Sequence, residues 1–183
     1  AADDLVREAL APLSLDFGAT VTSSSRRTIP PLAHDERGAP LDACDAGRLV
    51  SLTDEGEACV YVWANPRLGS GLVGVGVDLA STEDFAGRRG ERFNRLLFSA
   101  GEHAFVRERY AGREEVGFSY AFSAKEAAFK LFSADKLTFH EMRVEPFCLS
   151  ALGKVSLTNL QRQSTISLYY QFERDYVLVY TAP

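Results

Sequence analysis

One segment constrains the fold of this chain most: FSYAFSAKEAAFK at residues 118–130 carries charged side chains at helical spacing within an otherwise apolar stretch. If residues 122–133 form one helix, Glu126 and Lys130 lie on the same face, and Lys125 points toward a neighbouring stripe. The chain has only four lysines among twenty basic residues, and two of the four fall in this window. A lysine ammonium suits a phosphate, and a carboxylate beside it can hold a divalent metal ion on that phosphate. The alternative is a solvent-exposed Glu–Lys pair, worth roughly 0.2–0.5 kcal/mol.

A second segment, SGLVGVGVDLAS at residues 70–81, predicts a buried strand over residues 72–79 that carries Asp78 at its end. A carboxylate within an apolar run is costly unless it is paired, hydrogen-bonded or metal-bound. Gly74 and Gly76 would let another backbone or a ligand come close to the strand. The G-x-G pattern is not a dinucleotide fingerprint, because no third glycine opens a helix after it. Asp78 is therefore a candidate site residue.

Together, the two segments resemble the signature of the 4′-phosphopantetheinyl transferase superfamily, which is G-(I/V)-D followed by (F/W)-x-x-K-E-(A/S)-x-x-K. Further similarity lies in ERGAPL (36–41), LVSLTDEGEACVYVWA (49–64) and FSAGEHAF (98–105). The last of these resembles the F-T-x-x-E helix start of the holo-acyl-carrier-protein synthase branch. Because SLTD precedes GVD, the order of segments resembles the two-lobed, pseudodimeric branch of the family.

The resemblance implies an α+β fold in which helices pack on antiparallel sheets, as a pseudodimer with a shortened first lobe at 1–66 and a second lobe at 67–183. Hydrophobic patterning predicts a weak helix near 3–10, then a loop through about residue 47. It predicts further helices at 88–98, 101–109 and 122–133. Strands are predicted at 49–53, 58–63, 72–79, 137–144, 152–158, 165–172 and 175–181.

The resemblance also implies the reaction, which is the transfer of 4′-phosphopantetheine from coenzyme A to a serine of a carrier protein, with release of adenosine 3′,5′-bisphosphate. Asp78 and Glu126 would hold Mg²⁺ on the pyrophosphate of coenzyme A. Lys130, together with Lys125, would neutralise the charge that develops on the phosphates. Glu126 or a water on the metal would accept the proton of the serine.

Three positions depart from the family pattern. Asp54 stands where the family usually has a histidine, and Ala39 stands where it usually has a lysine. We expect Arg37 and Arg26 to bind the coenzyme A phosphates beside Asp54, although arginines in such a stretch are often only solvated. Ala80 replaces a third carboxylate ligand of many members, so water would complete the shell of a magnesium ion.

The charge distribution suggests a partner. Residues 87 to 113 contain seven arginines and three glutamates, which gives this segment a net charge of +4 in a chain whose net charge is −5. A basic face on helices 88–113 would steer an acidic acyl carrier protein toward the site; the alternative is an ordinary solvated helix surface. The apolar side chains of FNRLLF (93–98) would pack inward or against the carrier. An acidic chain without an aromatic-interleaved basic stripe is a poor match for nucleic acid.

No window is long and apolar enough for a membrane span and no signal peptide opens the chain, so a cytoplasmic location is expected. The three cysteines and three histidines lack metal-ligand or disulfide spacing. Because the chain begins without methionine, we expect an excised domain or a trimmed chain, and one natural source would be a domain built into a polyketide or fatty-acid synthase. Two rival functions stay open: a catalytically silent carrier-docking module of the same fold, and another Mg²⁺-dependent phosphate-transfer enzyme.

Overall fold

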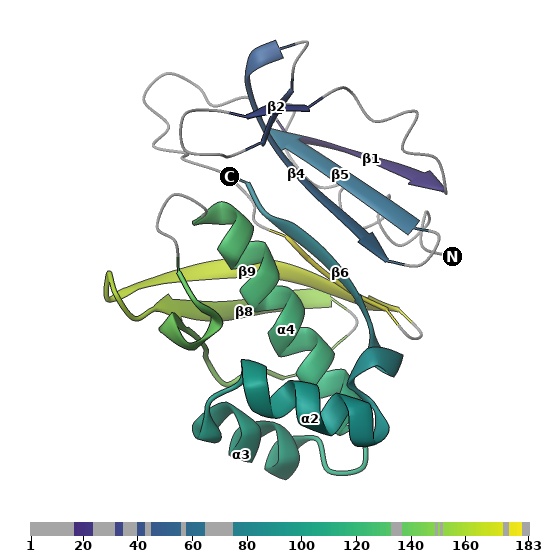
Figure 1. Ribbon diagram of the computed structural model, residues 1–183, viewed down its shortest axis with the longest axis vertical. Coiled ribbons are helices and arrows are strands. Elements are labelled where there is room, and N and C mark those ends of the chain that lie inside the picture. The colour runs from purple at the N-terminus through teal and green to yellow at the C-terminus, as the bar shows by residue number, and fades with distance from the viewer. Residues whose placement is uncertain are drawn as a thin grey trace.

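The computed structural model describes residues 17–23, 32–34, 40–42, 45–55, 58–64, 75–132, 137–148, 150, 152–173 and 176–180. They form two antiparallel five-stranded sheets and three α-helices (Figure 1). The first sheet contains β1 (Phe17–Ser23), β2 (Leu32–His34), β3 (Pro40–Asp42), β4 (Asp45–Glu55) and β5 (Ala58–Ala64). The second contains β6 (Val77–Ser81), β7 (Met142–Val144), β8 (Leu152–Asn159), β9 (Ser164–Glu173) and β10 (Tyr176–Tyr180). The α+β class predicted from the sequence is confirmed.

The two sheets have the same strand order. The first is β1-β5-β4-β3-β2 and the second is β6-β10-β9-β8-β7, so in each sheet the first strand pairs with the last. The sheets differ in the segment that connects their first strand to the next one. In the second sheet, this segment is residues 82–141 and contains α2 (Gly87–Leu97), α3 (Ala100–Arg109) and α4 (Glu114–Leu131). In the first sheet, only residues 24–31 lie between β1 and β2, which is too short for such a set of helices.

Helix α4 lies across the second sheet and forms the centre of the core (Figure 1). Its buried face consists mainly of small residues, among them Ala121, Ala124, Ala127 and Ala128, which let the helix axis approach the strands closely. Tyr120 is fully buried on the same helix and packs its ring edge-on against Tyr170 of β9, with 4.2 Å between the ring centroids. The position of α4 on the sheet is therefore fixed by this close packing.

Gly76, just before β6, is where the chain comes closest to α4. A Cβ atom built on Gly76 would lie 1.9 Å from the carbonyl oxygen of Ala127. The prediction that this glycine permits close approach of another backbone is confirmed, whereas Gly74 lies outside the described residues.

We predict that Gly76→Ala lowers the free energy of unfolding by about 1–3 kcal/mol, because overpacking forces the strand and the helix apart. Urea denaturation measures the change. Gly101→Ala is the matched control, since a Cβ atom there meets nothing within 4 Å and alanine favours the helix. Equal stability of the Gly76 variant and the wild-type chain would contradict the prediction.

The two sheets meet where β4 runs along β6. The hydroxyl of Ser51 accepts a hydrogen bond from the Val77 N–H (3.1 Å), and that of Thr53 accepts one from the Leu79 N–H (3.3 Å). β6 is an edge strand of its sheet, so these two N–H groups have no strand partner on that side. Residues 51 and 53 point to the same side of β4 because side chains alternate along a strand. Two short hydroxyl side chains of β4 thus provide hydrogen-bond acceptors for backbone N–H groups at the edge of the second sheet.

Several predicted boundaries were wrong. The strand predicted at 72–79 begins at Val77 within the described residues, so Asp78 is near its start; its pairing with β10 covers only Val77–Ser81. The helix predicted from residue 122 begins at Glu114, because tertiary packing overrides the weak helix propensity of the Gly, Ser and aromatic residues there. In the segment predicted as strand 137–144, a 3₁₀ turn, η4 (Phe139–Glu141), precedes the short β7.

The largest error lies in the first lobe, where β1, β2, β3 and the start of β4 occupy the predicted loop. Strands of three residues, such as β2 and β3, are too short to show an alternation of apolar and polar residues. They form because neighbouring strands of the sheet pair with them, which the local sequence does not show. The weak helix predicted at 3–10 lies outside the described residues. The helices predicted at 88–98 and 101–109, and the strands at 58–63, 152–158 and 165–172, are confirmed as α2, α3, β5, β8 and β9.

Candidate active site

Asp78 is the centre of a small polar cluster between β4, β6 and α4. One carboxylate oxygen, Oδ1, accepts hydrogen bonds from Thr53 Oγ1 (3.1 Å) and Lys130 Nζ (3.0 Å). The other oxygen, Oδ2, accepts a hydrogen bond from Ser123 Oγ (2.8 Å). The side chain of Asp78 is 7% exposed, so this buried acid has the partners that its desolvation requires. Two elements far from β6 in the sequence, β4 and α4, therefore fix both oxygens of this carboxylate.

Lys130 lies in the last turn of α4, where a cation is favoured by the carbonyl end of the helix. Its Nζ atom donates to the backbone oxygen of Val77 at 2.8 Å as well as to Asp78. The side chain remains 25% exposed. The ammonium group thus sits at the solvent side of the buried Asp78 carboxylate, where it can also reach an anionic ligand.

Glu126 lies one helical turn before Lys130 and is half-buried. Burial and the neighbouring Asp78 carboxylate both raise the pKa of Glu126, and the ammonium of Lys130 offsets only part of this effect. Two carboxylates that repel each other in a partly desolvated place favour a proton or a cation between them. The structure therefore brings together three of the predicted site residues: Asp78, Glu126 and Lys130.

The raised pKa gives a stability prediction for Glu126→Gln. Below the ordinary pKa of a glutamate, near 4.5, the side chain is protonated in both the folded and the unfolded chain, and the substitution changes little. As the pH rises through the raised folded pKa, the folded chain gains a charge that is less favourable there than in the unfolded chain. We expect Glu126→Gln to raise the free energy of unfolding by about 1 kcal/mol at pH 8, a typical gain at a functional site.

Urea denaturation at pH 4 and pH 8 without divalent metal measures this effect. Glu108→Gln, which removes an exposed carboxylate of α3, is the control and should change stability at neither pH. A Glu126 variant that is less stable than the wild-type chain at pH 8 would contradict the electrostatic account.

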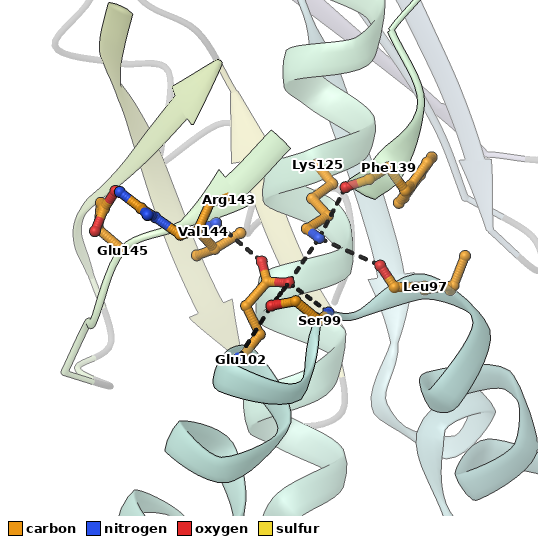
Figure 2. A network of polar contacts seen from close by, with 8 residues as sticks. All are labelled: Leu97, Ser99, Glu102, Lys125, Phe139, Arg143, Val144 and Glu145. Carbon is orange, nitrogen blue, oxygen red and sulfur yellow. Dashed lines mark hydrogen bonds and ion pairs between the residues drawn. The ribbon is translucent and has the colours of Figure 1, made fainter. Parts of the chain in front are cut away.

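Lys125 faces away from this cluster. Its side chain is fully buried, and Nζ donates to Glu102 Oε2 (2.9 Å), to the backbone oxygen of Leu97 (3.2 Å) and to that of Phe139 (3.0 Å) (Figure 2). Burial lowers the pKa of Lys125, and the Glu102 carboxylate opposes that shift. An ammonium group saturated by three acceptors has no donor left for coenzyme A. The structure therefore does not bring Lys125 to the other predicted site residues.

The remaining predicted coenzyme A residues lie partly outside the described chain. Asp54 belongs to β4, where it pairs with Cys59 of β5, but its side chain is not described. Arg37 and Arg26 lie outside the described residues. Ala80 is buried in β6. Within the described ranges, no group of three or more His, Cys, Asp and Glu side chains is placed to hold a metal ion.

Sequence reasoning missed the side chains that hold these groups in place. Thr53 and Ser123 bind Asp78, and Glu102 binds Lys125. A signal existed for Ser123, which lies two helical turns before Lys130 and therefore on the same side of α4. Thr53 gave no such signal, because only the pairing of the two sheets brings it to β6.

A family model of the 4′-phosphopantetheinyl transferase superfamily matches residues 74–181, which is more than half of the chain. The chain belongs to this superfamily. The match contains Asp78, Glu126 and Lys130 together with the whole second sheet and its three helices. The reaction of this superfamily is 4′-phosphopantetheinyl transfer, so membership indicates a transferase of this general kind. No curated protein matches the chain.

A helix that spans a membrane requires sufficient length and hydropathy. In the described part of the chain, no helix combines enough length with enough apolar character to cross a bilayer. The cytoplasmic location stays a prediction.

Proposed function

We propose that the chain transfers 4′-phosphopantetheine from coenzyme A to a serine of an acyl or peptidyl carrier protein of polyketide or fatty-acid synthesis, in a Mg²⁺-dependent reaction of the holo-acyl-carrier-protein synthase type. The observation that carries the proposal is the buried Asp78 carboxylate, which Lys130 Nζ holds at 3.0 Å, with Glu126 one helical turn before Lys130 on the same helix. This arrangement combines a place for a divalent cation with a cation for a phosphate.

The residues present fit a magnesium ion. Mg²⁺ is commonly bound by one or two carboxylates, with water and substrate phosphate completing its shell. Asp78 and Glu126 would provide the two carboxylates, since the Asp78 carboxylate is close enough to Glu126 to raise its pKa, second to the effect of burial. When bound, the ion would polarise the pyrophosphate of coenzyme A and neutralise charge on the leaving group.

The protein groups would then perform the remaining steps. The carrier serine oxygen forms a bond to the phosphorus attached to pantetheine, and the bond from that phosphorus to adenosine 3′,5′-bisphosphate breaks. Glu126 accepts the serine proton as general base. Lys130 holds the departing phosphate through its ammonium group. Phosphoryl transfer depends mainly on such positioning and electrostatics, so a small set of residues is sufficient.

The proposed docking surface for the carrier lies on α2 and α3. Phe93 and Leu96 of α2 are 37% and 66% exposed, in contrast to the buried Phe98, so FNRLLF divides between the surface and the core. The Phe93 ring lies 5.7 Å from that of Phe122, which is one turn before Glu126 on α4. Exposed arginines also occur on these two helices: Arg92, Arg95, Arg107 and Arg109. An acidic carrier with an apolar patch would therefore dock within reach of Glu126.

We further propose a two-lobed pseudodimer with lobes at residues 1–66 and 67–183. The shared strand order of the two sheets supports a structural duplication, and the short connection 24–31 supports a first lobe without the helical insertion. Asp54 follows Thr53, which binds Asp78, so its backbone is next to the site. Asp54, Arg37 and Arg26 are the proposed contribution of the first lobe to coenzyme A binding, beside Lys130.

Calorimetry and mass spectrometry together test this function. We expect coenzyme A to release heat of binding in the presence of Mg²⁺ and to bind at least about tenfold more weakly in EDTA, because the metal neutralises the pyrophosphate. Apo-carriers incubated with the chain, coenzyme A and Mg²⁺ should gain the mass of one phosphopantetheine group. A silent docking module predicts no heat, and another phosphate-transfer enzyme predicts no such mass gain.

A further inference from the structure

A buried network joins five segments of the second lobe around Lys125 and Glu102. Glu102 Oε2 accepts hydrogen bonds from Lys125 Nζ (2.9 Å) and from the backbone N–H (2.8 Å) and hydroxyl (2.9 Å) of Ser99. Its other oxygen, Oε1, accepts one from the Val144 N–H of β7 at 3.0 Å. Figure 2 shows Lys125 directed from α4 toward this carboxylate. We call Lys125 and Glu102, with these partners and the Leu97 and Phe139 carbonyls, the Lys125 clamp.

The clamp fixes the C-terminal end of α2. Lys125 Nζ holds the carbonyl of Leu97, the last residue of α2, and Ser99, the N-cap of α3, is held by Glu102. Elsewhere α2 contacts the core through the Phe93 ring, which lies 5.8 Å from Phe85 and 5.7 Å from Phe122. It also approaches Phe85 closely at Gly90, where a Cβ atom would lie 2.2 Å from the Phe85 backbone. The clamp adds the polar contacts that hold the C-terminal end of α2, where the chain turns into α3.

Lys125 and Glu126 are neighbours on α4 but lie on different faces of the helix. Lys125 holds the α2–α3 corner, and Glu126 lies near enough to Asp78 of β6 for the two carboxylates to repel each other. The polar groups of the clamp are saturated, so the lysine has three fixed acceptors and the glutamate four fixed hydrogen bonds. Such a network has one geometry, whereas apolar packing of the same volume allows several.

We propose that Lys125 and Glu102 are positioning residues, which hold α2 in the orientation that brings the serine of a docked carrier to Glu126. This inference rests on the proposed function. Neither side chain touches coenzyme A or the carrier. Because the docking surface lies on α2 itself and the carboxylates lie on β6 and α4, loss of the clamp leaves both surfaces intact and changes only their relative position.

The test uses the double variant Lys125→Met/Glu102→Gln, which removes both buried charges at similar volume. Replacement of a whole buried ion pair is often tolerated by the fold, whereas removal of one partner is not. We expect kcat for carrier modification to fall about 10- to 100-fold, the cost of a small misplacement of reacting groups. KM for the carrier and Kd for coenzyme A with Mg²⁺ should stay within about twofold, since binding to each separate surface is unchanged.

Lys154→Met is the control, because Lys154 is an exposed lysine of β8 and should affect none of these quantities. A folded double variant with wild-type kcat would show that the pair is only structural and would overturn the proposal. A double variant that fails to fold, or that no longer binds coenzyme A, would overturn it as well.

Hydrogen exchange tests the inference without any substrate, which separates its failure from that of the proposed function. The amides of α2 should exchange at least about tenfold faster in the double variant, while those of α4 and β6 keep their protection. Unchanged hydrogen-exchange rates of the α2 amides in the double variant would overturn the proposal that the clamp holds α2 in place. A wild-type chain that modifies no carrier, but whose α2 loosens in the double variant, would contradict only the proposed function.

Discussion

Glu126→Gln is expected to reduce the rate of carrier modification by at least about a thousandfold, because one residue provides both a carboxylate for the metal and an acceptor for the serine proton. Glutamine keeps the size of the side chain and removes only its charge. Because the substitution also relieves the repulsion from Asp78, the variant should be at least as stable as the wild-type chain. Loss of activity would then be a loss of chemistry and not of the fold.

The corresponding substitution at Asp78 is Asp78→Asn, which also removes the charge and keeps the size of the side chain. Asp78→Ala should also abolish modification, but it would leave Thr53, Ser123 and Lys130 without their shared acceptor, and the destabilisation would obscure the result. Mass spectrometry of an apo-carrier over time measures the rates, with Glu108→Gln as the control for an exposed carboxylate. Near-normal turnover by either Glu126→Gln or Asp78→Asn would contradict the roles assigned to these residues.

Lys125→Met is expected to cost about 3–5 kcal/mol of folding free energy, because it leaves the Glu102 carboxylate buried without its cation. Domains are usually stable by only about 5–15 kcal/mol, so this single change removes a large part of the total. The Leu97 and Phe139 carbonyls would also lose a donor. Urea denaturation measures the loss, and the double variant with Glu102→Gln should recover much of it.

An exposed lysine provides the comparison. Lys154 of β8 lies over the ring of Tyr169 at the surface, and Lys154→Met should change stability by less than about 1 kcal/mol. A Lys125→Met variant that matches this control would show that the buried pair contributes little.

Much of the second lobe could be predicted from local patterns. Helices α2 and α3 and strands β8 and β9 have clear periodicity, and the apolar surroundings of Asp78 required partners for its carboxylate. The spacing of Glu126 and Lys130 placed both on one side of a helix. The local patterns did not show which side of α4 packs against the sheet. On α4, the large Phe129 is 39% exposed, whereas the small Ala124 and Ala127 are fully buried.

The amino-acid sequence by itself determined the α+β class, the superfamily signature and three residues of the candidate site, because helical and strand periodicity and motif spacing are local properties. Only the tertiary structure decided that Lys125 faces Glu102, that Thr53 and Ser123 hold Asp78, and that strands β1 to β5 form a sheet of their own. Each of these depends on contacts between segments far apart in the chain. Such contacts are selected by close packing and by the need to satisfy buried polar groups, which no local pattern records.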